Sequence, residues 1–200
     1  MGTDAFIKIK LLIFKILLPL FIVVNVGLLA TSYYFYNVIM RYSHTNAYSA
    51  IDYQKEVKDL GYDYSSLNAA EKEHVDIKSN FGYNLKGLFI ENPMESKNTI
   101  ILVHGIGRDK EWSIMKYGPL FLKNGFNVFA YDSRDHGRSG GKYPTYGFYE
   151  SDDLEKCIAY VKNRKKNDVI GIHGESMGAS VLTIWAGKYD NDGVSFLIED

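Results

Sequence analysis

The sequence predicts an α/β domain, in which helices cover both faces of a parallel β-sheet, preceded by one long apolar helix. From residue 73 onward, short apolar runs alternate with amphipathic helical segments, the pattern of parallel strands joined by helices. The stretch from Ile16 to Tyr36 contains no charged residue. The segment from Gly174 to Gly178 has the pattern G-x-S-x-G and stands between an apolar run and a helical segment.

The apolar stretch from Ile16 to Tyr36 is predicted to cross a membrane. It has about the 20 residues that a helix needs to span the hydrocarbon core. Basic residues are concentrated before it, within residues 1–15, and only Arg41 follows closely, so the positive-inside rule predicts a cytoplasmic N-terminus and a domain outside the cytoplasm. One alternative is a signal peptide that is cleaved to release a secreted protein, although Leu28 fits a cleavage site poorly. The other is a helix buried in a globular domain.

Residues 37–72 are polar and rich in tyrosine, and they predict a juxtamembrane connector to a domain formed by residues 73–200. The domain is expected to begin with a hairpin of strands Val75–Ser79 and Leu85–Ile90, which turns at Gly82. The elements expected after the hairpin are, in order, strand 99–103, helix 115–123, strand 128–131, helix 149–165, strand 169–172, helix 177–188 and strand 194–198.

Each of these elements has its own signal. The strands are continuous apolar runs, as expected where a parallel sheet is buried on both faces. Asn124 and Gly125 end the first helix. In the second helix, Leu154, Ile158 and Val161 fall on one face. The basic run within residues 162–166 is interpreted as the solvated end of that helix.

The composition excludes several classes of protein. Lys and Arg number 23 and Asp and Glu number 24 among the 200 residues, which gives a net charge of −1. A nucleic-acid-binding protein should carry a basic excess or stripe, so no nucleic-acid partner is expected. Cys157 is the single cysteine, which excludes an intramolecular disulfide and a cysteine-rich zinc site.

The G-x-S-x-G segment is the motif that carries chemistry. It follows the apolar run 169–172 and opens the helix 177–188, the strand–turn–helix setting of a nucleophile elbow. Ser176 then lies in a strained turn, and Gly174 and Gly178 are needed because a Cβ at either position would clash with the neighbouring strand or helix. The motif predicts Ser176 as a nucleophile at a helix N-terminus, which favours developing negative charge.

A second loop, His104 to Gly107, follows the first parallel strand of the predicted sheet. A backbone N–H from this loop can face the same site as Ser176. With the N–H of Met177 it would form an oxyanion hole, the pair of donors that stabilises a tetrahedral intermediate. Gly105 and Gly107 give this loop its freedom to turn.

Residues from about Val75 to Asp200 resemble the first half of an α/β-hydrolase, most closely the serine aminopeptidase-like or lysophospholipase-like group. The resemblance is carried by the loop 104–107, the elbow 174–178 and the segment 132–139, which is similar to a D-x-R-G-H-G-x-S turn. It implies Ile106 as the second oxyanion donor. Asp135 stands where this turn usually has glycine, and Asp is among the residues that tolerate a positive φ.

The catalytic triad of this family runs in the order Ser, then Asp or Glu, then His. Ser176 is followed by no histidine, so the sequence offers no candidate for the general base, and Asp200 is interpreted as a turn residue. The five histidines, all before Ser176, are His44, His74, His104, His136 and His173. We therefore expect a truncated domain that exposes an apolar edge strand, 194–198, and is prone to aggregate.

Cofactor and metal sites are not expected. The sequence from Gly105 begins G-x-G, but Lys110 occupies the third glycine position of a dinucleotide fingerprint, and no phosphate-binding G-x-x-x-x-G-K-[ST] occurs. Asp132, Asp135 and His136 lie in one turn without the spacing of a ligand set.

Three functional hypotheses stay open. The first is a membrane-anchored serine hydrolase that cleaves an ester, thioester or peptide bond in a small-molecule, peptide or lipid acyl substrate. The second is a catalytically inactive protein of the same fold that serves as a binding or scaffold module. The third is a non-functional remnant. The sequence indicates neither the substrate nor the oligomeric state.

Overall fold

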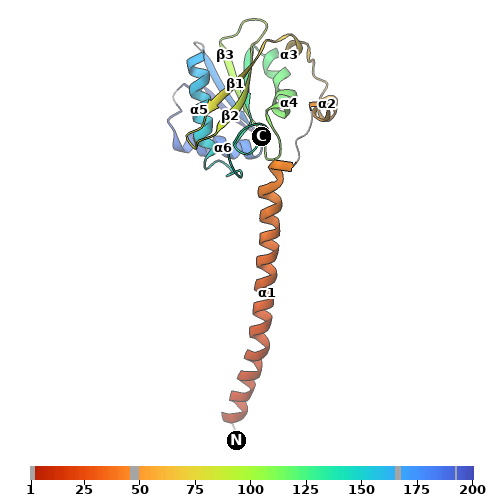
Figure 1. Cartoon of the computed structure of the whole chain (residues 1–200), viewed down its shortest axis with the longest axis vertical. Coiled ribbons are helices and arrows are strands. Elements are labelled where there is room, and N and C mark those ends of the chain that lie inside the picture. The colour runs from red at the N-terminus through yellow and green to blue at the C-terminus, as the bar shows by residue number, and fades with distance from the viewer. Residues whose placement is uncertain (1–2, 46–49, 165–167, 192) are drawn as a thin grey trace. The chain divides into compact units, whose positions relative to one another are not determined.

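The centre of the fold is a mixed β-sheet (Figure 1). The computed structural model describes residues 3–45, 50–164, 168–191 and 193–200. Within these residues the sheet has six strands in the order β1-β2-β4-β3-β5-β6. The strands are β1 (Lys72–Lys78), β2 (Asn84–Ile90), β3 (Asn98–Val103), β4 (Phe126–Tyr131), β5 (Val169–Gly174) and β6 (Phe196–Glu199).

The sheet combines an antiparallel edge with a parallel centre. The β1–β2 hairpin is antiparallel, and β2 pairs with β4 in the same sense, from Gly87 opposite Tyr131 to Ile90 opposite Val128. The pairs β3–β4, β3–β5 and β5–β6 are parallel. Parallel strands end at the same edge of the sheet, so the loops after β3, β4 and β5 meet there.

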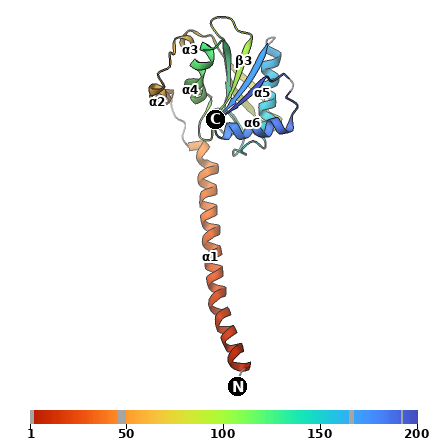
Figure 2. The same cartoon turned by 180° about the vertical axis from the view of Figure 1, so that it is seen from behind.

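Helices cover both faces of the sheet, which confirms the α/β architecture and the N-terminal hairpin predicted from the sequence. Helices α5 (Glu150–Arg164) and α6 (Met177–Lys188) lie on one side and α4 (Lys110–Lys123) on the other (Figures 1 and 2). Strand β3 shows why its run is continuously apolar. Ile101 and Val103 belong to the core beneath α5 and α6, whereas Ile100 and Leu102 belong to the core beneath α4.

Helix α4 begins at Lys110, earlier than the predicted start at residue 115. The Asp109 side chain accepts a hydrogen bond from the Trp112 N–H at 3.1 Å and so caps the first turn. Pro119 lies inside the helix. The sequence analysis missed this start, although aspartate at position 109 is a residue type favoured at helix N-caps.

The basic end of helix α5 is only in part the solvated helix end that the sequence predicts. Lys162 and Arg164 fall in its last turn, whereas Lys165 and Lys166 lie outside the described residues. The guanidinium of Arg164 lies over the Phe89 ring and forms ion pairs with Glu73, at 2.7 Å, and with Glu91. Arg164 therefore joins the helix to the hairpin, because its long side chain lies along the sheet.

Contacts divide the chain into two units, Met1–Arg41 and Tyr42–Asp200. The first contains most of helix α1 (Thr3–Thr45), whose segment Lys10–Val38 includes an 18-residue window with a mean hydropathy of 2.5 and is long and apolar enough to cross a membrane. By length and composition it equally fits a signal sequence.

Part of the segment 37–72 that was predicted as a connector, residues 50–69, packs against the domain, whereas residues 37–45 belong to α1. Residues 50–69 form α2 (Ala50–Val57), a short 3-10 helix (Lys58–Leu60) and α3 (Ser65–Ala69). Leu67 of α3 belongs to the core beneath α4, and the Tyr64 hydroxyl donates a hydrogen bond to the Met115 carbonyl at 3.0 Å. This segment therefore completes the outer layer on the α4 side of the sheet.

The fully buried ring of Phe129 on β4 gives a test of this core. It packs against the rings of Phe89, Tyr131 and Tyr160. We expect Phe129→Ala to lower the free energy of unfolding by about 3–5 kcal/mol, because it leaves a cavity in a packed interior. The same change at Phe148, which is 68% exposed, should cost less than about 1 kcal/mol. Urea unfolding of the detergent-solubilised protein checks this, and equal losses would contradict the assigned core.

Candidate active site

Ser176 lies in a strained turn between β5 and α6. Its backbone has φ 53° and ψ −112°, a conformation that residues other than glycine seldom adopt, and its side chain is exposed. A Cβ added to Gly174 would lie 2.6 Å from the Gly178 carbonyl carbon, and one added to Gly178 would lie 2.2 Å from the Val103 carbonyl oxygen. Only glycine fits at either position, so the two glycines bring the turn against β3 and hold Ser176 clear of the sheet.

The loop after β3, residues His104–Arg108 and hereafter the His104 loop, lies beside Ser176. A Cβ added to Gly105 would lie 3.3 Å from the Ser176 Cβ and 3.8 Å from its Oγ. The Gly107 N–H donates to His136 Nε2 at 3.2 Å. Within the described residues, the N–H groups of Ile106 and Met177 have no such acceptor, and Met177 is the first residue of α6, where helix N–H groups are left free. The structure thus brings all the predicted site residues, 105–107 and 174–178, into one region.

Two buried histidines hold the His104 loop to the segment after β4. The His104 Nδ1–H donates to the Gly105 carbonyl at 2.8 Å, and its Nε2 accepts the Ser133 N–H at 2.9 Å. The His136 Nδ1–H donates to the Arg134 carbonyl at 2.8 Å. The two rings are 4.9 Å apart. Because a carbonyl only accepts and an N–H only donates, each ring is fixed as the neutral Nδ1–H tautomer.

The electrostatic environment keeps both rings neutral. Burial lowers the pKa of His104. Burial, and next the neighbouring His104, lower the pKa of His136 to about 4. With both nitrogens of each ring bonded to backbone groups, neither histidine is available as the general base for Ser176.

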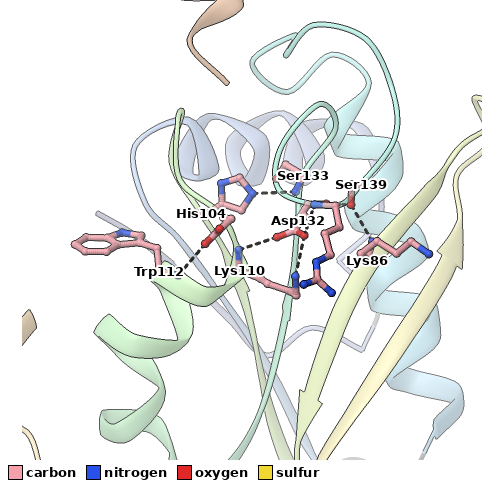
Figure 3. Close-up of polar contacts among 9 residues, drawn as sticks. Lys86, His104, Lys110, Trp112, Asp132, Ser133 and Ser139 are labelled. Carbon is pink, nitrogen blue, oxygen red and sulfur yellow. Dashed lines mark hydrogen bonds and ion pairs between the residues drawn. The ribbon is translucent and has the colours of Figure 1, made fainter. Parts of the chain in front are cut away.

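The carboxylate of Asp132 organises the segment after β4, residues 132–140, hereafter the Asp132 turn. Asp132 is fully buried and accepts hydrogen bonds from the Lys110 N–H at 2.9 Å, the Lys110 Nζ at 2.8 Å and the Arg138 N–H at 2.8 Å. Figure 3 shows Asp132 beside Lys110, with His104 directed at Ser133 and Ser139 at Lys86. Asp135 has φ 62°, so it adopts the positive φ that aspartate tolerates.

Helix α4 holds the residue before Ser176, an interaction that the sequence analysis missed. The two Glu175 carboxylate oxygens accept hydrogen bonds from Trp112 Nε1 and Lys116 Nζ, each at 2.6 Å. Residues 112 and 116 are one helical turn apart and share a face. That spacing was visible in the sequence, but the start of α4 had to be known before it indicated a pair of donors.

His173 and Asp200 both contact Tyr117 of α4. The His173 ring packs against the Tyr117 ring, with centroids 4.1 Å apart and planes tilted by 47°, and burial lowers the pKa of His173. The Asp200 carboxylate accepts the Tyr117 hydroxyl at 2.7 Å, a bond that lowers the pKa of Asp200. The Asp200 carbonyl accepts the Ser176 N–H at 2.7 Å. Among the described residues, no histidine nitrogen forms a hydrogen bond with Ser176 Oγ, and no group of three or more His, Cys, Asp or Glu is placed to hold a metal ion.

An exposed serine with positive φ, between two close-packed glycines where a parallel strand meets a helix, has the geometry of the nucleophile elbow of α/β-hydrolases. The model of the alpha/beta hydrolase fold family matches residues 98–198, which contain the His104 loop, the Asp132 turn and the elbow. The chain belongs to this family.

Relatives of known sequence or structure agree with this assignment. YqkD, an uncharacterized protein of Bacillus subtilis, is 44% identical over 151 residues, which cover 74% of this chain and 49% of YqkD. Caffeoylshikimate esterase of Arabidopsis thaliana is 34% identical over 99 residues, 45% of this chain and 28% of the esterase. The structure of the Pyrococcus furiosus esterase Pf2001 matches with a TM-score of 0.55 and 32% identity, over 69% of this chain and 51% of that one. The chain thus spans about half the length, or less, of these relatives.

The contacts around Gly178 predict a large effect of one methyl group. Gly178→Ala should lower the free energy of unfolding by about 3 kcal/mol or more, because its Cβ would overlap the Val103 carbonyl of β3. Gly187, on the same helix, has no atom within 4 Å of an added Cβ, so Gly187→Ala should stabilise by up to about 1 kcal/mol. The urea midpoints of unfolding of the two variants test this prediction. Equal midpoints for Gly178→Ala and Gly187→Ala would contradict the close contact between α6 and β3.

Because the His136 ring is neutral and buried, we expect the folded protein to lose stability in acid. Its pKa is about 4 in the folded protein against 6.5 for an ordinary histidine. Between these values the unfolded chain binds more protons, so the stability contributed by the neutral ring is fully present above pH 6.5 and falls as the pH is lowered towards 4. The fall is on the order of 3 kcal/mol, because each pKa unit is worth about 1.4 kcal/mol.

Urea unfolding at several pH values tests this pH dependence. His136→Gln places a side-chain acceptor for the Gly107 N–H at about the reach of Nε2 but does not titrate, so its stability should fall less steeply with pH than that of the wild type. His74→Asn, on the exposed face of β1, serves as the control and should keep the wild-type slope. Parallel curves for wild type and His136→Gln would show that His136 does not carry the effect.

Proposed function

We propose that this chain forms the nucleophile-bearing part of a membrane-anchored serine hydrolase that cleaves an ester, thioester or peptide bond through Ser176. The observation that carries the proposal is the exposed, strained Ser176 placed against Gly105 of the His104 loop. Strain in a serine backbone costs stability, of order 1–3 kcal/mol, and such strain clusters at active sites where it presents a reacting group.

In the proposed reaction, Ser176 Oγ attacks the carbonyl carbon of the substrate and its proton passes to a general base. The carbonyl oxygen becomes an oxyanion, which accepts hydrogen bonds from the N–H groups of Ile106 and Met177 at the start of α6. Collapse of the tetrahedral intermediate expels the alcohol, thiol or amine with a proton and leaves an acyl group on Ser176. Water then cleaves the acyl ester and restores the serine.

The general base and the acid that orients it come, in this proposal, from residues outside the given sequence. Ser176 is followed by no histidine in the given sequence, and YqkD is about twice as long as the part that matches. His104 and His136 are held by backbone hydrogen bonds and serve the His104 loop. A catalytically inactive binding or scaffold protein is the second candidate, favoured by the absence of a histidine bonded to Ser176 among the described residues.

An ester is the favoured bond. Two relatives above 30% identity are esterases by name, the Arabidopsis thaliana and Pyrococcus furiosus proteins. The apolar helix supports attachment to a membrane, with residues 1–15 in the cytoplasm and the hydrolase domain on the other side. A small-molecule, peptide or lipid acyl substrate fits this proposal, and secretion after cleavage of a signal sequence is the alternative.

A fluorophosphonate probe tests the proposal, because it reacts with an activated serine and forms a stable covalent adduct. We expect the protein, as its source cell makes it, to gain about one label per chain, measured by intact mass. Ser176→Ala should abolish labelling. Ser180→Ala, an exposed serine one turn further along α6, should label as the wild type does. No Ser176-dependent label on the wild-type protein would overturn the hydrolase and favour the inactive alternative.

A further inference from the structure

Helix α2, which lies between the apolar helix and the domain in the sequence, packs against the start of α4. Tyr53 is 1% exposed, and its ring lies 5.5 Å from that of Trp112. The Tyr53 hydroxyl is hydrogen-bonded to Asp109, the residue that caps α4. Tyr53, Val57 and Trp112 form a small buried cluster of their own. Helix α2 is therefore fixed to the same turn of α4 that carries Trp112.

An ion pair joins α2 to the His104 loop. The Glu56 carboxylate accepts two hydrogen bonds from the Arg108 guanidinium, at 3.2 and 2.9 Å. The guanidinium lies 4.1 Å above the Trp112 ring, a cation–π contact. The Arg108 N–H donates to the Gly105 carbonyl at 3.3 Å and closes the turn that contains Ile106. Arg108 therefore connects α2 to the residue proposed as an oxyanion donor.

Trp112 contacts both Arg108 and the elbow. While Tyr53 and Arg108 lie against its ring, its indole N–H donates to the Glu175 carboxylate at 2.6 Å. Glu175 directly precedes Ser176. One aromatic side chain thus lies between α2, the His104 loop and the elbow. The Glu56–Arg108 ion pair is bidentate, a geometry that makes it stronger than an ion pair with a single contact.

We infer that α2 is a positioning element of the active site: Glu56 holds Arg108, and Tyr53 holds Trp112, so that the Ile106 N–H and Ser176 keep their relative placement. Glu56, Arg108 and Trp112 are positioning residues, because they act through the His104 loop and Glu175 and do not reach the substrate carbonyl. The inference rests on the proposed hydrolase function and assigns a role in it to the segment that follows the apolar helix.

The test is the rate at which Ser176 reacts with the fluorophosphonate probe. Glu56→Gln keeps the shape of the side chain and removes its charge. We expect its maximum labelling rate to fall about threefold to fivefold with the probe concentration for half-maximal rate unchanged. Trp112→Phe keeps the ring and removes the indole N–H, and should slow labelling in the same way. The exchange of charges, Glu56→Arg with Arg108→Glu, should recover part of the lost rate.

A matched control separates positioning from general loss of stability. Asp76→Asn breaks an ion pair with Lys86 on the hairpin, remote in sequence from α2 and the elbow, and should label at the wild-type rate. Wild-type rates for both Glu56→Gln and Trp112→Phe would overturn the inference while leaving the hydrolase proposal intact.

Hydrogen exchange gives a second readout that does not depend on activity. In Glu56→Gln, amide exchange in peptides covering 104–108 and 174–178 should be about threefold to fivefold faster than in wild type, with β1 peptides unchanged as the internal reference. Unchanged exchange in both regions would overturn the inference even if the protein shows no labelling. Absence of labelling with faster exchange would instead support the positioning contact and reject the hydrolase.

Discussion

The buried carboxylate of Asp132 is the constraint on which the rest of the site depends. A carboxylate without partners in the protein interior costs several kcal/mol, so Asp132 must be surrounded by donors. Lys110 supplies its backbone N–H and its ammonium group, and Arg138 supplies a further N–H. These bonds fix the first residue of α4 and the path of the Asp132 turn together. A Cβ added to Gly137 would lie 2.3 Å from the Asp132 carboxyl carbon, so the turn also closes tightly over it.

Two routes lead from Asp132 to Ser176. Through Lys110, it sets where α4 begins, and α4 in turn directs Trp112 at Glu175 beside the serine. Through the Asp132 turn, it places His136 where that ring accepts the Gly107 N–H of the His104 loop. The His104 loop and the elbow are thus both positioned by hydrogen bonds that lead back to Asp132.

The sequence revealed the features that depend on residues close together in the chain. The strand positions follow from local apolar runs, and the glycines around Ser176 follow from a local motif, with a backbone strain that the structure bears out at φ 53°. The tolerance of Asp135 for a positive φ could likewise be inferred from its place in a local motif. The contacts of α2 could not, because Glu56 and Arg108 are 52 residues apart and no periodicity links a polar segment to a distant loop. The pairing of β2 with β4 was hidden for a similar reason, since β3 and α4 separate the two strands in the sequence.

Pro119 in the middle of α4 couples two distant positions in the evolution of this chain. Proline has no N–H, so the carbonyl one turn earlier, that of Met115, loses its helical partner. The Tyr64 hydroxyl donates to that carbonyl at 3.0 Å and replaces the missing donor. A substitution that removes the Tyr64 hydroxyl would leave the half-buried Met115 carbonyl unpaired, unless Pro119 were also replaced by a residue with an N–H. Positions 64 and 119 are therefore expected to change together among descendants of this sequence, although neither touches the chemistry.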